Sequence, residues 1–444
     1  MTSEQRPLTT RRRGAWLLSL VAGAVLLGWA AQGRHAWDAR AAVAPDALRG
    51  SGKLKLADEL PTWRDSEVAE PEALSGSAES RLLAAYRLVG ERRLDAALQV
   101  TTALARDYPQ FRLGQLLHAD LLAAHVQPLA GFGRPAAAMA VAPEASATGD
   151  ALTGLQQEAA ARLHALQQRP PAGLVPAELV RLPASVPHAI VVDASRSRLY
   201  LFRHDVQGLQ LVQDFYVSVG KQGVDKQAEG DQKTPLGVYY TLNAVAPAQL
   251  DIRFGAGALP LNYPNALDRN DGRTGSGILL HGVPIGTYSR PPLDSDGCVA
   301  MANDDLLRLM ATLPERDTPV VITREIHWVA PAQAGALPAS FEQAWSAWQR
   351  ARLQGTPALL DPLYAPNATL AVTGEQAERF RSRLQVPPAA VDEVSVLTWH
   401  DHTPMLVVTF RERAGATVKR DRVVRQYWGQ QGADWRIVAE GPVR

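Results

Sequence analysis

The sequence predicts a multidomain α+β protein, and three observations support that class. The chain has 444 residues, which exceeds the usual size of one domain and suggests roughly three at about 150 residues each. Apolar residues recur with helical spacing before residue 170, whereas the last part combines an amphipathic helix with several strand-like runs. Hydrophobic residues make up 46% of the chain, enough for a sizeable core. The predicted parts are 1–32, 33–77, 78–170, 186–325 and 338–444.

The first part is a basic end followed by an apolar segment. Ala15–Ala31 contains one hydroxyl and no charge, and three arginines, Arg11 to Arg13, precede it. Its length lies between a signal-peptide core of about 7–15 residues and a membrane span of about 20. Because positive flanks stay in the cytoplasm, we expect an uncleaved inner-membrane anchor that sends the rest of the chain outward. A cleaved signal is the alternative, and a buried soluble helix fits the arginine flank poorly. Residues 33–77, rich in alanine, charge and proline, are predicted to be a linker.

The charge balance argues against one class of partner. Lysine plus arginine total 46 and aspartate plus glutamate total 45, a formal net charge of +1. Nucleic-acid-binding domains usually concentrate positive charge, so no nucleic-acid partner is predicted.

The part at 78–170 is predicted to be helical. Apolar residues share one face in 82–89, 94–105, 111–122 and 155–166, with glycine or proline between the first three segments. The pattern resembles a tetratricopeptide-type helical hairpin, of which about one repeat is visible, and a small helical bundle is the equal alternative. Either arrangement favours a docking or spacing module over a catalytic one.

The part at 338–444 is predicted to be a helix followed by a sheet. The helix covers 341–353, and the strands are 394–399, 405–411, 423–428 and 435–438. The helix with Trp345 and Trp348, together with the aromatic-rich strands, resembles the cone-shaped nuclear-transport-factor-2-like (NTF2-like) domains. His400, Asp401 and His402 lie between two strands without a third metal-ligating residue in view, so a polar hairpin turn is predicted rather than a metal site.

The middle part contains the only cysteine, Cys298, in the string Ser295-Asp296-Gly297-Cys298-Val299. His281 and Gly282 end an apolar strand upstream. A free cysteine is often an inert buried thiol, but a thiolate nucleophile needs a base such as imidazole. The tight turn before Cys298 favours the nucleophile. We expect the turn to lead directly into a helix, whose N-terminal N–H groups would lower the thiol pKa.

These residues resemble the L,D-transpeptidase (YkuD-type) catalytic domain of bacterial cell-wall enzymes. The resemblance covers roughly Pro187 to Arg324 and includes a first hairpin at 188–202, the run Tyr216–Gly220 and the signature Gly230-x-x-x-Thr-Pro-x-Gly-x-Tyr239. It departs at Asp296, where many members have histidine, and at Ala300, where many have arginine. Both departures put the outcome of the reaction in doubt, although not the thiol chemistry.

The resemblance implies a β-rich domain and assigns roles to particular residues. Cys298 is the expected nucleophile, His281 the base, Gly282 the carbonyl that orients the imidazole, and Gly297 with Cys298 the oxyanion donors. The candidate substrate-binding residues are Tyr263, Arg273, Arg290, Ser295 and Asp296. The alternative for Tyr263 and Arg273 is structural packing, and the alternative for Arg290 is an ordinary exposed loop residue. No cofactor and no metal are expected.

The implied function is acyl transfer from a peptidoglycan tetrapeptide stem: the diaminopimelate–D-alanine bond is cut, D-alanine leaves, and the acyl group passes through a thioester to an amine. An amine on a second stem gives a 3–3 crosslink, and an amine on a protein gives attachment. The alternatives are hydrolysis of the same bonds, as a carboxypeptidase or amidase-type enzyme, and a non-catalytic envelope scaffold. The expected partners are peptidoglycan stem peptides, the inner membrane and envelope proteins. The expected location is the bacterial cell envelope, with the catalytic part in the periplasm, or exported if the signal is cleaved.

Overall fold

The computed structural model describes residues 74, 76–124, 129–131, 134–135, 147–288, 290–415 and 420–443. The predicted membrane segment at 15–31 and nearly all of the linker at 33–77 lie outside these residues, so both stay predictions. Within the described ranges, no helix is both long enough and apolar enough to span a bilayer.

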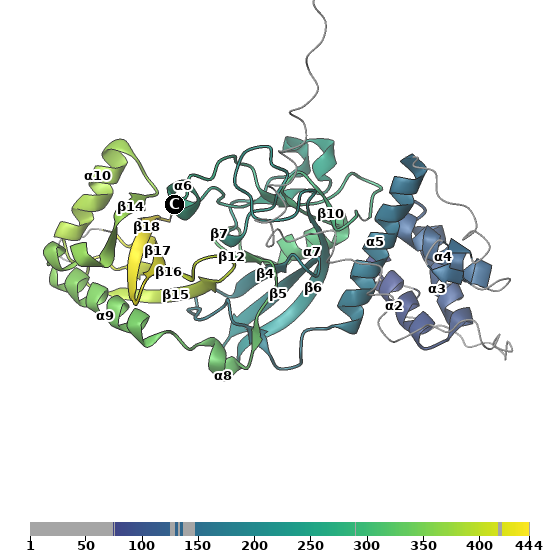
Figure 1. Cartoon of the computed structure of the whole chain (residues 1–444), viewed down its shortest axis with the longest axis horizontal. Helices are drawn as coiled ribbons and strands as arrows, with labels where there is room; N and C mark the ends of the chain where they lie inside the picture. The colour runs from purple at the N-terminus through teal and green to yellow at the C-terminus, as the bar shows by residue number, and fades with distance from the viewer. Residues whose placement is uncertain are drawn as a thin grey trace, which may run out of the picture. The chain divides into compact units, whose positions relative to one another are not determined.

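The N-terminal module is a set of four helices, drawn in purple and blue in Figure 1. They are α2 (Ala78–Gly90), α3 (Leu94–Asp107), α4 (Arg112–Ala124) and α5 (Ala147–Gln167). Three predicted segments fall within these helices, the segment 111–122 begins one residue before α4, and α5 begins earlier than its apolar pattern indicated. Two short strands, β1 (Leu129–Gly131) and β2 (Arg134–Pro135), pair with each other between α4 and α5. The shared core includes Leu82, Tyr86, Val100, Leu104, Phe111 and Leu117.

The middle part is built on a nine-stranded sheet in the order β7-β12-β4-β5-β6-β11-β9-β8, with β10 paired to β6. Figure 1 shows β4, β5 and β6 side by side. The strands are β4 (His188–Asp193), β5 (Arg198–Asp205), β6 (Gly208–Gly220), β7 (Gly237–Tyr240), β8 (Ala258–Pro260), β9 (Leu279–His281), β10 (Leu293–Ser295), β11 (Val299–Met301) and β12 (Pro319–Thr323). Two short helices, α6 (Ala266–Asn270) and α7 (Asn303–Thr312), complete it. The long buried runs in β4 and β12 explain their central position, because a strand covered on both faces is apolar throughout.

The C-terminal part contains a five-stranded sheet in the order β14-β18-β17-β16-β15. Its strands are β14 (Tyr364–Leu370), β15 (Val391–Trp399), β16 (Met405–Glu412), β17 (Arg422–Gln431) and β18 (Asp434–Pro442). The helices are α8 (Pro331–Ala334), α9 (Ala339–Gln354) and α10 (Gly374–Ser382). Before α8, β13 (Trp328–Val329) pairs with β3 (Val175–Pro176). The predicted helix and four predicted strands are all present.

The two faces of this C-terminal sheet belong to different cores. Val396 packs in the core that holds Trp345 and Trp348 of α9, whereas its neighbours Leu397 and Trp399 pack in the core of the middle part. Alternation along a strand sends successive side chains to opposite faces, so β15 contributes to both cores. The C-terminal sheet therefore lies between α9 and the middle part.

The predicted hairpin turn at His400–His402 is a point of attachment to the middle part. Asp401 accepts hydrogen bonds from the Thr323 hydroxyl (2.8 Å) and the Arg324 backbone N–H (3.1 Å). It also accepts one from the Trp399 indole N–H at 2.9 Å. His402 contacts Asp225 at 2.9 Å. Among the described residues no group of three metal-ligating side chains is gathered, here or elsewhere.

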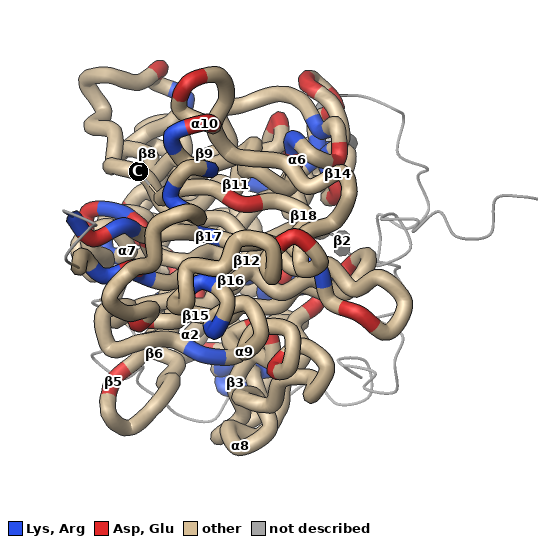
Figure 2. The backbone as a smooth tube through the Cα atoms, turned by 90° about the vertical axis from the view of Figure 1, so that its left-hand side faces the viewer, with Lys and Arg blue, Asp and Glu red and all other residues tan. Residues whose placement is uncertain are grey.

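Charges of opposite sign are interspersed along the chain. Figure 2 shows red and blue segments side by side on α10, where Glu375 and Arg379 form an exposed pair at 3.1 Å. This matches the near-zero net charge of the sequence.

The fold class is confirmed as a mixed helix-and-strand multidomain protein with a β-rich middle part. The resemblances of the first and last parts to tetratricopeptide and NTF2-like domains stay predictions.

Candidate active site

Cys298 lies in a tight turn between β10 and β11. The Ser295 hydroxyl donates to the Cys298 carbonyl (2.5 Å) and accepts from the Gly297 N–H (3.1 Å), which closes the turn. Gly297 has φ +125°, and a Cβ there would lie 2.8 Å from the Lys233 carbonyl oxygen. Both the backbone conformation and the space therefore require glycine at this position.

The expected helix directly after Cys298 is wrong. Val299–Met301 forms β11, and α7 begins only at Asn303. The apolar residues Val299 and Met301 follow strand alternation, which over three residues cannot be told from helical spacing. A helix N-terminus therefore does not act on the thiol.

His281 ends β9, which lies between β8 and β11. Its Nδ1 is 2.5 Å from the Gly282 carbonyl oxygen. Because a carbonyl oxygen can only accept, Nδ1 carries the proton, and Nε2 of the neutral ring is left as an acceptor. The ring of Phe254 meets the imidazole edge-on, with 4.9 Å between centroids. The Gly282 contact implied by the resemblance is thus present. Phe254 is a second neighbour of the imidazole, and no sequence motif predicted it.

Asn303 holds the segment that follows His281 and was also missed. Its Oδ1 accepts from the N–H groups of Ala256 (2.9 Å) and Val283 (3.1 Å), and its Nδ2 donates to the Val283 carbonyl (2.9 Å). A Cβ on Gly282 would lie 2.1 Å from that Oδ1, so Gly282 leaves room for this contact. No local pattern marks an asparagine at the start of a helix as the support of a distant loop.

Burial sets the protonation of both candidate catalytic groups. It lowers the pKa of His281 to about 4, although the hydrogen bond to Gly282 opposes the shift. It raises the pKa of the Cys298 thiol, although a hydrogen bond with the Leu279 backbone opposes that shift. The resting pair is therefore a neutral imidazole and a neutral thiol at pH 7.

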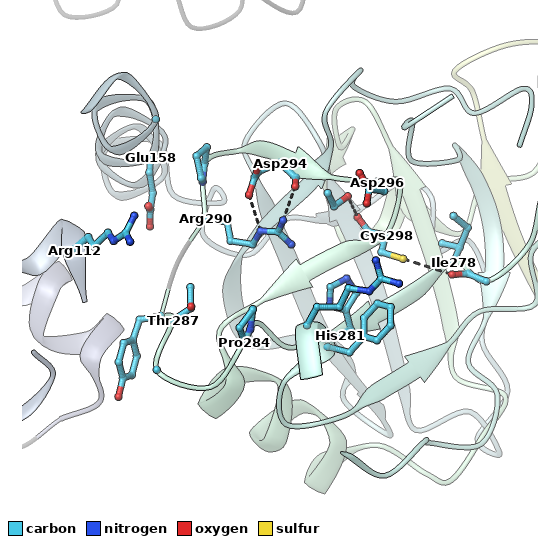
Figure 3. A pocket seen from close by; sticks show the side chains of 18 of the residues that line it. Arg112, Glu158, Ile278, His281, Pro284, Thr287, Arg290, Asp294, Asp296 and Cys298 are labelled. Carbon is cyan, nitrogen blue, oxygen red and sulfur yellow. Dashed lines mark hydrogen bonds and ion pairs between the residues drawn. The ribbon is translucent and has the colours of Figure 1, made fainter. Parts of the chain in front are cut away.

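The two side chains do not touch each other in this conformation. The Cys298 sulfur lies 3.5 Å from the Gly277 carbonyl oxygen, and no hydrogen bond joins it to His281 in the described structure. Figure 3 shows the sulfur directed toward Ile278 and away from the imidazole. A rotation about χ1 of this partly buried cysteine is needed for contact, and catalytic contacts often tighten only with substrate bound.

Cys298 and His281 line one cleft of about 620 Å³. Near Cys298 its wall includes Lys226, Glu229 and the glycine-rich segment Gly275–Gly277. Beyond His281 it is lined by residues of the helical module and by a loop that contributes Pro284, Gly286, Thr287, Tyr288, Arg290 and Pro291. The cleft therefore extends to both sides of the candidate nucleophile.

Arg290 and Asp296 line this cleft, but each already has a partner. Arg290 donates to the Asp294 carboxylate (2.7 Å) and to the Asp294 carbonyl (2.6 Å). Asp296 pairs with Lys221 at 3.0 Å, and that contact lowers the Asp296 pKa. A substrate carboxylate would have to compete with Asp294 for Arg290.

Tyr263 and Arg273 are not among the residues that line the cleft. The Tyr263 hydroxyl donates to the Thr274 carbonyl at 2.9 Å, and its ring lines a separate cavity between the middle and C-terminal parts. Arg273 is buried and pairs with Asp268 at 3.8 Å. The structure thus brings five predicted residues to the cleft, namely Cys298, His281, Arg290, Ser295 and Asp296. Gly282 contacts the His281 imidazole through its carbonyl, and Gly297 belongs to the turn before Cys298. Tyr263 contacts Thr274 of the glycine-rich loop, and Arg273 pairs with Asp268.

Comparison with known proteins identifies the middle part. Residues 187–322 match the family model of YkuD, described as the L,D-transpeptidase catalytic domain. No curated protein sequence matches the chain.

Similar solved structures include Bd1075 of Bdellovibrio bacteriovorus, with 22% identity and a TM-score of 0.49 over 61% of this chain and 98% of that one. The helical cell shape determining protein Pgp2 of Campylobacter jejuni has 19% identity and a TM-score of 0.46 over 57% and 91%. An L,D-transpeptidase from Mycobacterium smegmatis has 12% identity and a TM-score of 0.21 over 31% and 58%.

Proposed function

We propose that this chain is a peptidoglycan L,D-transpeptidase that works by cysteine acyl transfer. One observation carries the proposal: within a segment that matches the YkuD catalytic domain, an imidazole held by a backbone carbonyl shares a cleft with the only cysteine. The donor is a tetrapeptide stem, cut between diaminopimelate and the terminal D-alanine.

The first half-reaction forms a thioester. Cys298 rotates toward His281, whose Nε2 takes the thiol proton as the sulfur attacks the carbonyl carbon. The tetrahedral oxyanion is stabilised by the Cys298 N–H, since the Gly297 N–H already donates to Ser295. The C–N bond then breaks, and His281 returns the proton to the departing D-alanine amine.

The second half-reaction transfers the acyl group to an amine. The amine nitrogen attacks the thioester carbonyl carbon and His281 accepts the amine proton. The C–S bond then breaks, and His281 returns that proton to the sulfur to regenerate the thiol. The neutral ring favoured by burial suits this step, because only unprotonated Nε2 can accept a proton. An amine on another stem yields a 3–3 crosslink, and an amine on a protein yields attachment.

Hydrolysis is the second candidate because of one sequence feature. Ala300, where many family members carry arginine, is a buried residue of β11 and offers no cation to an acceptor. Water in place of the amine makes the enzyme a carboxypeptidase. The cell envelope is the proposed location in either case, with stem peptides as the partner.

The test uses the purified full-length chain and its Cys298→Ala variant with tetrapeptide-bearing muropeptides, and products are read by mass spectrometry. Cysteine-dependent dimers that lack one D-alanine support transpeptidation. Cysteine-dependent tripeptides without dimers support hydrolysis. Identical spectra with both proteins would contradict any enzymatic role and favour an envelope scaffold.

A further inference from the structure

The catalytic cleft is not formed by the YkuD-matching segment alone. Its far end is lined by residues of the helical module, among them Gln110 in the turn before α4, Arg112 at the start of α4, and Gly154 and Glu158 of α5. Figure 3 shows Arg112 and Glu158 at one end of the site and Cys298 toward the other, with Thr287, Pro284 and His281 between them.

The loop between His281 and Cys298 is held against this helical wall. The ring of Tyr288 meets those of Tyr108 and Phe111, with centroids 5.0 and 5.7 Å apart. A Cβ on Gly154 would lie 2.9 Å from the Pro291 ring, so α5 and the loop are in close contact. The helical module therefore shapes the cleft as well as lining it.

The same wall is tied to the sheet through a buried arginine. Arg162 of α5 donates to Glu158 (2.9 Å) and stacks on the ring of Tyr216 of β6, with its guanidinium carbon 3.9 Å from the ring centroid. The Tyr216 hydroxyl in turn donates to the Arg290 carbonyl at 2.8 Å. This chain of contacts fixes α5 relative to the loop.

The position of the base indicates which molecule occupies this end of the cleft. One imidazole gives a proton to the departing amine and takes one from the attacking amine, so both amines pass on the His281 side of the sulfur. The helical wall lies on that side (Figure 3). A departing D-alanine is too short to extend beyond His281, whereas an acceptor stem peptide continues from its amine toward α4.

The charge at the far end favours an anion. Arg112 is exposed and makes no hydrogen bond or ion pair with any residue the structure describes, whereas the Glu158 carboxylate is buried and already paired with Arg162. Arg112 is also the first residue of α4, where the positive end of the helix dipole adds to its charge. A cation is unfavourable at that position in an isolated helix, so its presence there is not explained by helix stability.

We propose that the helical module forms the acceptor subsite and that Arg112 binds a carboxylate of the acceptor peptide, several bonds from the attacking amine. The inference rests on the proposed transpeptidase function. In this proposal, the helical module determines which amine acceptors the enzyme uses.

The test compares two amine acceptors, a tripeptide-bearing muropeptide and the same compound with its stem carboxylates amidated. Each is offered with a tetrapeptide donor to the full-length wild-type protein, to Arg112→Glu and to Arg87→Glu. Arg87 is an exposed arginine of α2 outside the cleft and serves as the matched control. Dimer formation and D-alanine release are measured separately.

We expect the wild type and the Arg87→Glu variant to prefer the carboxylate acceptor by about tenfold or more, the scale of one charge-assisted contact. Arg112→Glu should lose that preference while still releasing D-alanine from the donor. Glutamate is favoured in the first turn of a helix, so unfolding of α4 would not account for the loss. If all three proteins release D-alanine and show the same ratio of the two acceptors in their dimers, the inference is overturned and the transpeptidase proposal stays intact. No D-alanine released by any of the three proteins would instead contradict the proposed function itself.

Discussion

At the scale of single residues, the candidate nucleophile is a neutral thiol that does not contact its base, His281, in this conformation. Cys298 is held over the Gly277 carbonyl, and burial opposes its ionisation. His281 is neutral and correctly protonated for proton transfer, yet it does not contact the sulfur. The arrangement favours proton transfer during attack over a preformed thiolate–imidazolium pair.

The reactivity of Cys298 should therefore depend on pH like that of a buried thiol. Because the pKa of the folded thiol is raised, the thiolate fraction at neutral pH is small and grows only above the ordinary value of about 8.5. Alkylation by iodoacetamide, followed by intact-mass spectrometry, should accelerate through the alkaline range. The Cys298→Ala variant should show no adduct. A reaction rate that is already maximal near pH 7 would instead indicate a stable thiolate.

Asn303 is predicted to act as a positioning residue for the base. Asn303→Ala removes three hydrogen bonds to Ala256 and Val283, each worth about 0.5–1.5 kcal/mol, and releases the segment that carries the Gly282 carbonyl. We expect kcat for D-alanine release to fall about tenfold or more, with a smaller change in KM.

Two variants distinguish positioning from general damage. Asn303→Asp keeps the acceptor and should retain more activity than Asn303→Ala, whereas the neighbouring exposed Asp304→Ala should match the wild type. A pH–rate profile unchanged in shape by Asn303→Ala, with only a lower melting temperature, would indicate a purely structural role.

At the scale of elements, helices and strands could be predicted from the sequence wherever apolar residues repeat with one period over the whole element. The helices of the first part and the strands of β15 to β18 were predicted because each buries one continuous face. The early turns of α5 were missed because small and polar residues dominate from Ala147 to Gly154, so the apolar stripe is weak there. Its contact with Pro291 comes from a loop far away in the sequence.

The candidate site was predictable only in part for the same reason. Cys298, His281, Gly282 and Gly297 lie within two short motifs, and the contacts among Ser295, Gly297 and Cys298 are local. Asn303 and Phe254 act through contacts that depend on the fold, and Arg112 reaches the cleft only through the fold, so no local pattern distinguishes these residues from ordinary surface residues. Tyr263 and Arg273 were predicted from their place in a loop sequence, but their side chains turn to other partners.

The C-terminal sheet contains a buried charge cluster whose loss should destabilise it. Glu412 of β16 accepts from Arg352 (2.7 Å) and Arg383 (2.9 Å), and all three side chains are at most 2% exposed. Glu412→Gln leaves the buried Arg352 without a carboxylate partner and Arg383 with Glu440 alone, which should cost about 3–5 kcal/mol. Urea unfolding followed by tryptophan fluorescence includes the signal of this core, because Trp345, Trp348 and Trp428 lie in it, while Trp399 reports on the core of the middle part.

The control for this cluster is an exposed pair on α10. Glu375→Gln disrupts a contact with Arg379 in which both side chains are largely solvated, so we expect a change within about 0.5 kcal/mol. Equal effects of the two substitutions would show that the buried cluster does not hold the sheet together.

At the scale of the whole molecule, the three parts meet through contacts that reach the cleft. Asp401 in the β15–β16 turn binds Thr323 and Arg324 of the middle part, and Arg324 lies 3.4 Å from Asp225. His402 also contacts Asp225, and the next residue, Lys226, lines the catalytic cleft. The C-terminal sheet thus braces one wall of the cleft, and the helical module forms the opposite end.

Asp401→Ala should loosen that brace. Three hydrogen bonds are lost, and we expect hydrogen–deuterium exchange to increase in 220–234 as well as in the turn itself. Asp434→Ala alters an exposed turn of the same sheet, between β17 and β18, and should leave exchange in 220–234 unchanged. Faster exchange confined to 400–404 in the Asp401→Ala protein would mean that the turn does not brace the cleft.

The strand order also determines when the sheet of the middle part can be completed during synthesis. β4, near the start of the middle part, pairs on one side with β5 and on the other with β12, which is the last strand of that part to be synthesised. Loop-closure entropy makes such distant pairings slow to form, because a long intervening chain must be gathered first. A nascent chain that ends before Thr323 lacks the strand that joins β4 to β7, even though it already contains both Cys298 and His281. The sheet that supports the thiol is therefore complete only after the 25 residues that follow Cys298, up to Thr323, have also been synthesised.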